Sequence, residues 1–229
     1  MHAEHEPAPR ANFELRPALA DPGAGLRWLV TAKLPAIAAT GADPYVETSH
    51  LYCKGFIELF LALGLRPRFI ILRRDASAVA RSLYQLSAIP YRTKDGRLVL
   101  LDPSDAGTLP FPGWQSAGDY ELCYWYALEI ERRQAAYREQ FLRDGIAYAD
   151  VWMHDLTQWE PFRALCAFVA PALDPSPRRA LYDELVAVNQ HPRDAALPGT
   201  VDRPVPDDAP RREALVRSAV AGRFAALVE

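Results

Sequence analysis

An unbroken apolar run at residues 69–72 (FIIL) constrains the fold of this chain more than any other feature. Arg68 precedes the run and Arg73 follows it. A continuous apolar run of this length is typical of a strand buried on both faces, as in a parallel sheet covered by helices. The run therefore predicts an α/β fold, with a parallel sheet flanked by helices.

Strand-like and helix-like segments alternate along the rest of the chain, which also favours a parallel sheet. Residues 45–49 and 146–155 show strand patterns. A helix is expected to begin at Asp75, an N-cap residue, directly after the strand at 69–73. Apolar periodicity predicts further helices at 26–40 (interrupted by Pro35), 55–64, 120–143, 160–169, 176–188 and 215–227.

Three stretches lack a clear period. Residues 1–26 are rich in proline and alanine and are expected to be irregular, and residues 90–118 are expected to form a lid-like loop. Residues 192–210 are a proline-rich linker to a C-terminal helix. The length of 229 residues fits one domain, so we predict a single domain over 1–229 that includes these three stretches.

Composition excludes several classes of protein. The net charge of −3 argues against nucleic acid or a polybasic membrane surface as the partner. The apolar runs are too short for an integral membrane segment and the N-terminus has no apolar signal core, so a cytoplasmic location is expected. Cys53, Cys123 and Cys166 are widely spaced, which predicts neither a disulfide framework nor a metal site.

A ligand is expected outside the carboxyl end of the 69–73 strand, where open α/β sheets collect their ligands. Arg74 stands at this end, and Ser82 follows it by eight residues in the next helix. A guanidinium and a hydroxyl supply hydrogen-bond donors that suit a phosphate. In the alternative interpretation, Arg74 pairs on the surface with a carboxylate such as Asp75 while Ser82 faces a neighbouring helix. Spacing alone favours neither.

The spacing of Arg74 and Ser82 resembles the 3′-phosphate-binding segment of sulfotransferases. These enzymes take a sulfuryl group from 3′-phosphoadenylyl sulfate (PAPS) and have a fold related to P-loop nucleotide hydrolases. The preceding segment 45–51 (YVETSHL) is similar to the strand and turn in which cytosolic members carry a catalytic histidine. His50 occupies the comparable place, although the following proline of the family is missing.

The resemblance covers about residues 4–170. Residues 5–7 (HEP) look like the second-strand region of bacterial sulfotransferases, where a glutamate faces the acceptor, and Glu6 would take that place. Asp155 and Leu156 look like the acidic residue and leucine that end a late strand of the family.

The chain departs from the family in one large respect, because the glycine-rich phosphosulfate loop is not recognisable. Gly23 and Gly25 are the one close glycine pair, and no Lys/Arg-Ser/Thr pair follows them. If Glu6 lies on the second strand, the first strand and the loop belong upstream of Met1. The chain is then a shortened sulfotransferase or a non-catalytic relative that has lost the loop.

The resemblance implies sulfuryl transfer from PAPS to a hydroxyl acceptor, a small molecule, glycan or lipid, with no metal. Arg74 and Ser82 would bind the 3′-phosphate of PAPS. His50 is the predicted base, since an unperturbed imidazole titrates near neutral pH, and Glu6 is its rival. Alternatively, His50 is a turn histidine bonded to backbone. Glu47 is a third possible base, although we favour an ion pair between Glu47 and Arg73 or Arg74.

The sequence leaves open an alternative enzyme class and the state of assembly. A P-loop kinase relative is a less favoured alternative, because neither a phosphate-loop lysine nor a magnesium-binding Ser/Thr is visible. A homodimer is one possible assembly, with the C-terminal helix docked on a second copy. A row of aromatic residues is formed by Tyr120, Tyr124, Trp125 and Tyr126. Most of these rings are expected in the core, and one or two of them could line an acceptor pocket.

Overall fold

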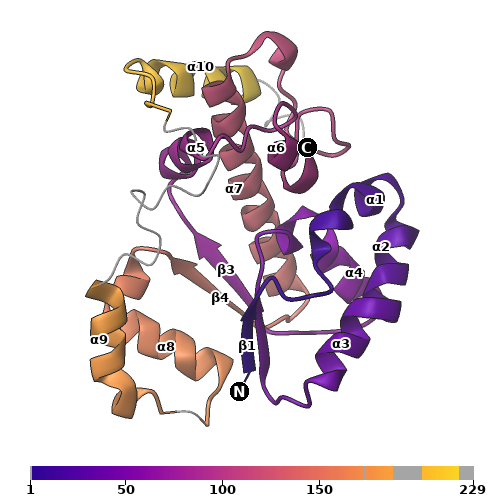
Figure 1. Cartoon of the computed structure of the whole chain (residues 1–229), viewed down its shortest axis with the longest axis vertical. Coiled ribbons are helices and arrows are strands. Elements are labelled where there is room, and N and C mark those ends of the chain that lie inside the picture. Colours follow the sequence, from indigo (N-terminus) through magenta and orange to yellow (C-terminus); the bar gives the residue numbers. More distant parts are fainter. Residues whose placement is uncertain (1, 173, 188–202, 222–229) are drawn as a thin grey trace.

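The computed structural model describes residues 2–172, 174–187 and 203–221, which form a mixed α/β structure (Figure 1). Strand β1 (His2–His5) pairs in parallel with β2 (Tyr45–Thr48). Strand β3 (Phe69–Arg73) pairs in parallel with β4 (Tyr148–Trp152). The prediction of parallel strands flanked by helices is confirmed, but the described strands form two separate two-stranded sheets.

The two faces of β3 have different surroundings. Ile71 is buried, and the Phe69 ring stacks on Phe141 at 4.6 Å between ring centroids, so this face packs on a helix. The side chains of Ile70 and Leu72 point to the other face and are 37% and 47% exposed. The expectation that both faces of this strand are covered is therefore wrong for one face. A helix buries one side, and no described element buries Ile70 and Leu72.

The stretch 1–26 was expected to be irregular, but its described residues, 2–26, lie mostly in regular elements. After β1 come η1 (Ala11–Phe13), α1 (Leu15–Ala20) and α2 (Pro22–Trp28). The side chain of Asp21 caps α2 by accepting a hydrogen bond of 2.8 Å from the Gly23 N–H. Helices of six or seven residues are too short to show a repeated apolar stripe, which explains why periodicity missed them.

The helix predicted at 26–40 does contain Pro35, but the proline does not end it. The π-helical turn η2 (Leu29–Lys33) joins α2 to α3 (Leu34–Ala39). Proline has no N–H for the helical ladder, and a wider turn lets the backbone continue past it. The chain then enters β2, followed by η3 (Tyr52–Lys54) and α4 (Phe56–Ala62).

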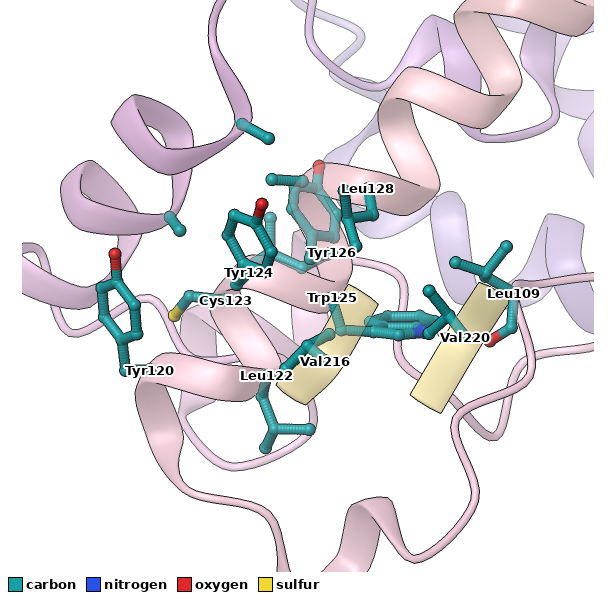
Figure 2. Packing of buried hydrophobic residues seen from close by; sticks show 14 of the residues in the cluster. Leu109, Tyr120, Leu122, Cys123, Tyr124, Trp125, Tyr126, Leu128, Val216 and Val220 are labelled. Carbon is teal, nitrogen blue, oxygen red and sulfur yellow. Dashed lines mark hydrogen bonds between the residues drawn. The ribbon is translucent and has the colours of Figure 1, made fainter. Parts of the chain in front are cut away.

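The central element is α7 (Asp119–Arg143), which packs against α5 (Ala76–Gln85) and α10 (Ala209–Ala221). The aromatic row near its start is buried, as predicted, and Figure 2 shows the rings of Tyr124, Trp125 and Tyr126 in the core. Val216 and Val220 of α10 belong to the same buried cluster. The start of α10 lies in the predicted linker, most of which falls outside the described residues.

Residues 90–118 do not form the separate lid that the sequence suggested. They contain α6 (Lys94–Val99) and η4 (Trp114–Ser116), and Leu101 and Leu109 are buried in the core around α7. The Trp125 indole N–H donates to the Leu109 carbonyl at 2.9 Å. Apolar side chains of this segment pack against α7. Their spacing has neither a helical nor a strand period, so the sequence does not predict that the segment is packed.

The segment that directly follows β4 packs beside it. It comprises η5 (Asp155–Thr157), α8 (Trp159–Val169), η6 (Ser176–Arg178) and α9 (Arg179–Ala187). The ring of Tyr182 lies 4.6 Å from Phe162 and 5.2 Å from Trp159, which joins α9 to α8. Within the described ranges, no helix has both the length and the hydropathy to cross a bilayer.

Candidate functional site

Glu6 and His50 meet at the carboxyl ends of β1 and β2. The parallel register pairs His5 with Thr48, so the residues that follow each strand emerge at the same edge. The Glu6 N–H extends the pairing by donating to the Thr48 carbonyl at 3.1 Å. The His50 Nδ1 lies 2.5 Å from the Glu6 Oε1. The structure thus joins the two residues that the sequence offered as rival bases.

The backbone and a neighbouring hydroxyl hold Glu6 in place. Its φ of 46° lies in the left-handed region, where a non-glycine residue is uncommon and strained. The Ser49 hydroxyl donates to the Glu6 Oε1 at 3.4 Å, and its own oxygen accepts the Leu51 N–H at 3.2 Å. The Glu6 carboxylate is 17% exposed and the His50 ring 45% exposed, so solvent reaches the imidazole.

The surroundings of His50 favour a neutral imidazole. Partial burial, and after it the charge of Lys54, lower the pKa of His50 to about 4, against the opposing effect of Glu6. A neutral ring that donates its Nδ1 proton to Glu6 keeps its Nε2 lone pair as an acceptor. Nε2 can therefore accept a proton while the carboxylate orients the ring, but the low pKa makes this imidazole a weaker base than the unperturbed one that the sequence suggested.

Lys54 is a third member of this region that sequence reasoning did not single out. The side chain is only 1% exposed, its ammonium donates to the Val99 carbonyl, and it lies 5.3 Å from the Tyr126 ring centroid. Burial lowers the pKa of Lys54 to about 7, and nearby Cys53 and Glu6 oppose that shift. Lysine is scarce in a chain that otherwise uses arginine, and this scarcity is the one sequence feature that sets Lys54 apart.

Glu47 is not available as a base, because it belongs to a buried network. The Lys33 ammonium lies 2.7 Å from the Glu47 Oε2, and the hydroxyls of Tyr45 and Tyr52 donate to its carboxylate at 2.8 and 2.6 Å. Burial raises the pKa of both tyrosines. The expected pairing of Glu47 with Arg73 or Arg74 is wrong, because Glu47 forms its ion pair with Lys33 of η2.

Arg74 and Ser82 lie where the spacing placed them, after β3 and within α5. Arg74 is exposed and Ser82 half-buried, and neither side chain has a hydrogen-bond or ion-pair partner within the described part of the chain. Asp75 caps α5 by accepting the Ala78 N–H at 2.9 Å, so the alternative surface pair of Arg74 with Asp75 does not form. With respect to the described residues, both side chains are available to a ligand.

A phosphate loop is not found at the one glycine pair that the sequence offered. Gly23 and Gly25 lie inside α2, and Gly25 is packed against Leu59 and Ala18. Over residues 2–172, 174–187 and 203–221, no three His, Cys, Asp or Glu side chains converge as metal ligands.

Comparison with known proteins gives no family to set beside this geometry. No family model matches the chain, and no curated protein and no solved structure is significantly similar to it.

Proposed function

We propose that this chain is a sulfotransferase that moves the sulfuryl group of PAPS to the hydroxyl of a small molecule or glycan. The observation that carries the proposal is the 2.5 Å contact between Glu6 and His50. Two segments that resemble acceptor-side motifs of sulfotransferases, far apart in the sequence, meet at one strand edge. A histidine oriented by a carboxylate is an arrangement suited to deprotonating a hydroxyl.

The roles of the side chains follow from their surroundings. His50 takes the acceptor's proton at Nε2, and Glu6 holds the ring and stabilises the imidazolium that forms. Arg74 and Ser82 bind the 3′-phosphate of the donor, because neither side chain has a partner among the described residues, with Arg74 just before α5 and Ser82 within it. Transfer itself passes the sulfuryl group from the phosphosulfate oxygen to the acceptor oxygen, with adenosine 3′,5′-bisphosphate leaving.

A non-catalytic sulfotransferase-like protein is the second candidate, and one observation favours it. Gly23 and Gly25 are helical, so they supply no phosphate-binding loop for the sulfuryl end of the donor. On this alternative the protein binds the nucleotide, or keeps only the fold, without transferring the group.

Transfer of radiolabelled sulfur from PAPS to a panel of hydroxyl acceptors tests the enzyme directly. We expect incorporation by the unaltered chain and a loss of about 100-fold or more in His50→Asn, the scale of a missing general base. His154→Asn is the matched control, because His154 is 73% exposed and follows β4, which belongs to a different sheet from the strands that end at Glu6 and His50. No incorporation, or equal incorporation by both variants, would contradict the proposed enzyme. Nucleotide binding without transfer would support the non-catalytic candidate.

A further inference from the structure

A polar cavity lined by residues of α4 and α7 includes neither Glu6 nor His50 and takes no part in the proposed reaction. Its volume is about 330 Å³, near the lower end of ligand pockets. One wall is a stripe along α7 that includes Arg132, Arg133, Ala136 and Gln140, and α4 contributes Glu58. Spacings of one, four and eight residues put these α7 side chains along a common strip of the helix surface.

Glu129 holds both arginines through hydrogen bonds, and each guanidinium keeps one nitrogen for a ligand in the cavity. The Glu129 carboxylate is fully buried, and it accepts two bonds of 2.8 Å from Arg132 and one of 2.5 Å from the Arg133 Nε. The Leu109 N–H supplies a further bond at 3.0 Å. The remaining guanidinium nitrogens, Nη1 of Arg132 and Nη2 of Arg133, have no protein partner among the described residues. One carboxylate against two guanidiniums leaves a net positive charge on this wall.

The other end of the cavity carries a carboxylate. The Tyr137 hydroxyl donates to the Glu58 Oε1 at 2.6 Å, and Glu58 is otherwise exposed, without an ion-pair partner in the described ranges. The Cys53 carbonyl connects the two ends, because Tyr137 and Arg133 both approach it, at 3.4 and 3.5 Å. A cation-binding group and an anion-binding group therefore face the same small space, a few hydrogen bonds apart.

We propose that this cavity binds a small amino acid or similar zwitterion. Its carboxylate would lie on the free nitrogens of Arg132 and Arg133, and its ammonium on Glu58. A zwitterion matches the two ends together, because the charges of Glu58, Glu129, Arg132 and Arg133 sum to zero. A simple anion would be repelled by Glu58 and a simple cation by the arginines. The half-buried Gln140 amide, which has no side-chain partner among the described residues, supplies a further polar contact. The inference does not depend on the proposed sulfotransferase activity.

Titration of the isotope-labelled protein with glycine, β-alanine and 4-aminobutyrate, followed through the arginine Nε–H signals in NMR spectra, tests this site. These probes carry the same two charges at different spacings. We expect at least one of them to shift the Arg132 and Arg133 signals saturably. Propionate and propylamine should bind more weakly by a factor of about ten or more. No saturable shift, or propionate binding as tightly as the amino acids, would overturn the proposal.

Two variants with matched controls localise the ligand. Ala136→Leu adds bulk at an exposed helical position, where leucine is well tolerated, and should weaken binding about tenfold. Glu139→Leu, one helical turn away and outside the cavity lining, should not. Glu58→Gln should reduce the amino-acid affinity to that of propionate, whereas Glu139→Gln should leave it unchanged. Binding unaltered by Ala136→Leu or Glu58→Gln would exclude this cavity as the site.

Discussion

The two parallel sheets present very different groups at their carboxyl ends. Beyond β1 and β2, Glu6 contacts His50 at 2.5 Å, and the strand residue Glu47 lies in a buried network with Lys33. Beyond β3, Arg74 stands exposed, with no side-chain partner among the described residues, and two apolar side chains of the strand itself are exposed. The first sheet ends in a carboxylate and an imidazole already bonded to each other. In the second sheet, Arg74 after β3 has no side-chain partner among the described residues, while His154 and Asp155 after β4 lie 3.2 Å apart.

This difference matches the two tasks of the proposed reaction. A base must be oriented before the acceptor arrives, so its partners come from the protein and restrict it in advance. An anion site needs donors that a phosphate can occupy, and a guanidinium already paired with a carboxylate would have to give that partner up. In the proposed reaction, the β1–β2 end would be the preformed acid–base half and the β3 end the open anion half.

The largest expected effect is the loss of Lys33 from its buried pair. Lys33→Met leaves Glu47 as an uncompensated buried charge and should lower the free energy of unfolding by about 3–5 kcal/mol. Arg138→Met, at the partly exposed Arg138–Asp150 pair of 2.9 Å beside β4, should cost no more than about 1 kcal/mol. Urea denaturation measures both. Equal losses would remove the contrast between the sheets, whereas a smaller loss in Lys33→Met/Glu47→Gln than in Lys33→Met would sharpen it.

A smaller difference in unfolding free energy is expected between substitutions on the two faces of β3. Ile71→Ala removes a buried side chain that packs toward α7, and should cost about 2–4 kcal/mol of unfolding free energy. Ile70→Ala, on the open face of the same strand, should cost less than about 1 kcal/mol, because the isoleucine is already 37% exposed. A thermal or urea transition gives both values. A loss at Ile70 as large as that at Ile71 would mean that the open face is covered in solution.

The pH response of His50 is the most local test of the preformed half. Its pKa of about 4 lies below that of an unfolded histidine, so neutral His50 favours the folded state above about pH 6.5. That contribution is lost as the pH falls toward 4. An NMR titration of the ring should show the low pKa, and Lys54→Met should raise it by removing a nearby positive charge. A wild-type pKa near 6.5, or no rise in the variant, would contradict the electrostatic account.

Sequence patterns predicted what depends on local order and missed what depends on tertiary contacts. The strand at 69–73 and the long helix at 120–143 were recognised because periodicity and length are local properties. The partner of Glu47 was assigned wrongly, since the choice between Lys33 and the arginines depends on how η2 packs against β2. The open face of β3 was also missed, because an apolar run predicts a buried strand without saying what covers it.

Within the candidate site, the sequence indicated residues but not their relationship. Glu6 and His50 were rival bases by resemblance, and only the parallel register of β1 with β2 shows that they touch. Lys54 belongs to no motif, and it is buried through contacts with Val99 and Tyr126, both remote in sequence. Arg74 and Ser82 could be placed from spacing, since a strand and the helix after it fix both positions.

Calorimetric titration with adenosine 3′,5′-bisphosphate tests the central claim, that Arg74 and Ser82 together bind a ribose-linked phosphate. The account predicts saturable binding that weakens about tenfold or more in Arg74→Ala and less strongly in Ser82→Ala, the scale of one lost charged or neutral hydrogen-bonding group. Arg178→Ala, another exposed arginine with no side-chain partner among the described residues, should leave the affinity unchanged. An absence of binding, or wild-type affinity in Arg74→Ala, would contradict the claim.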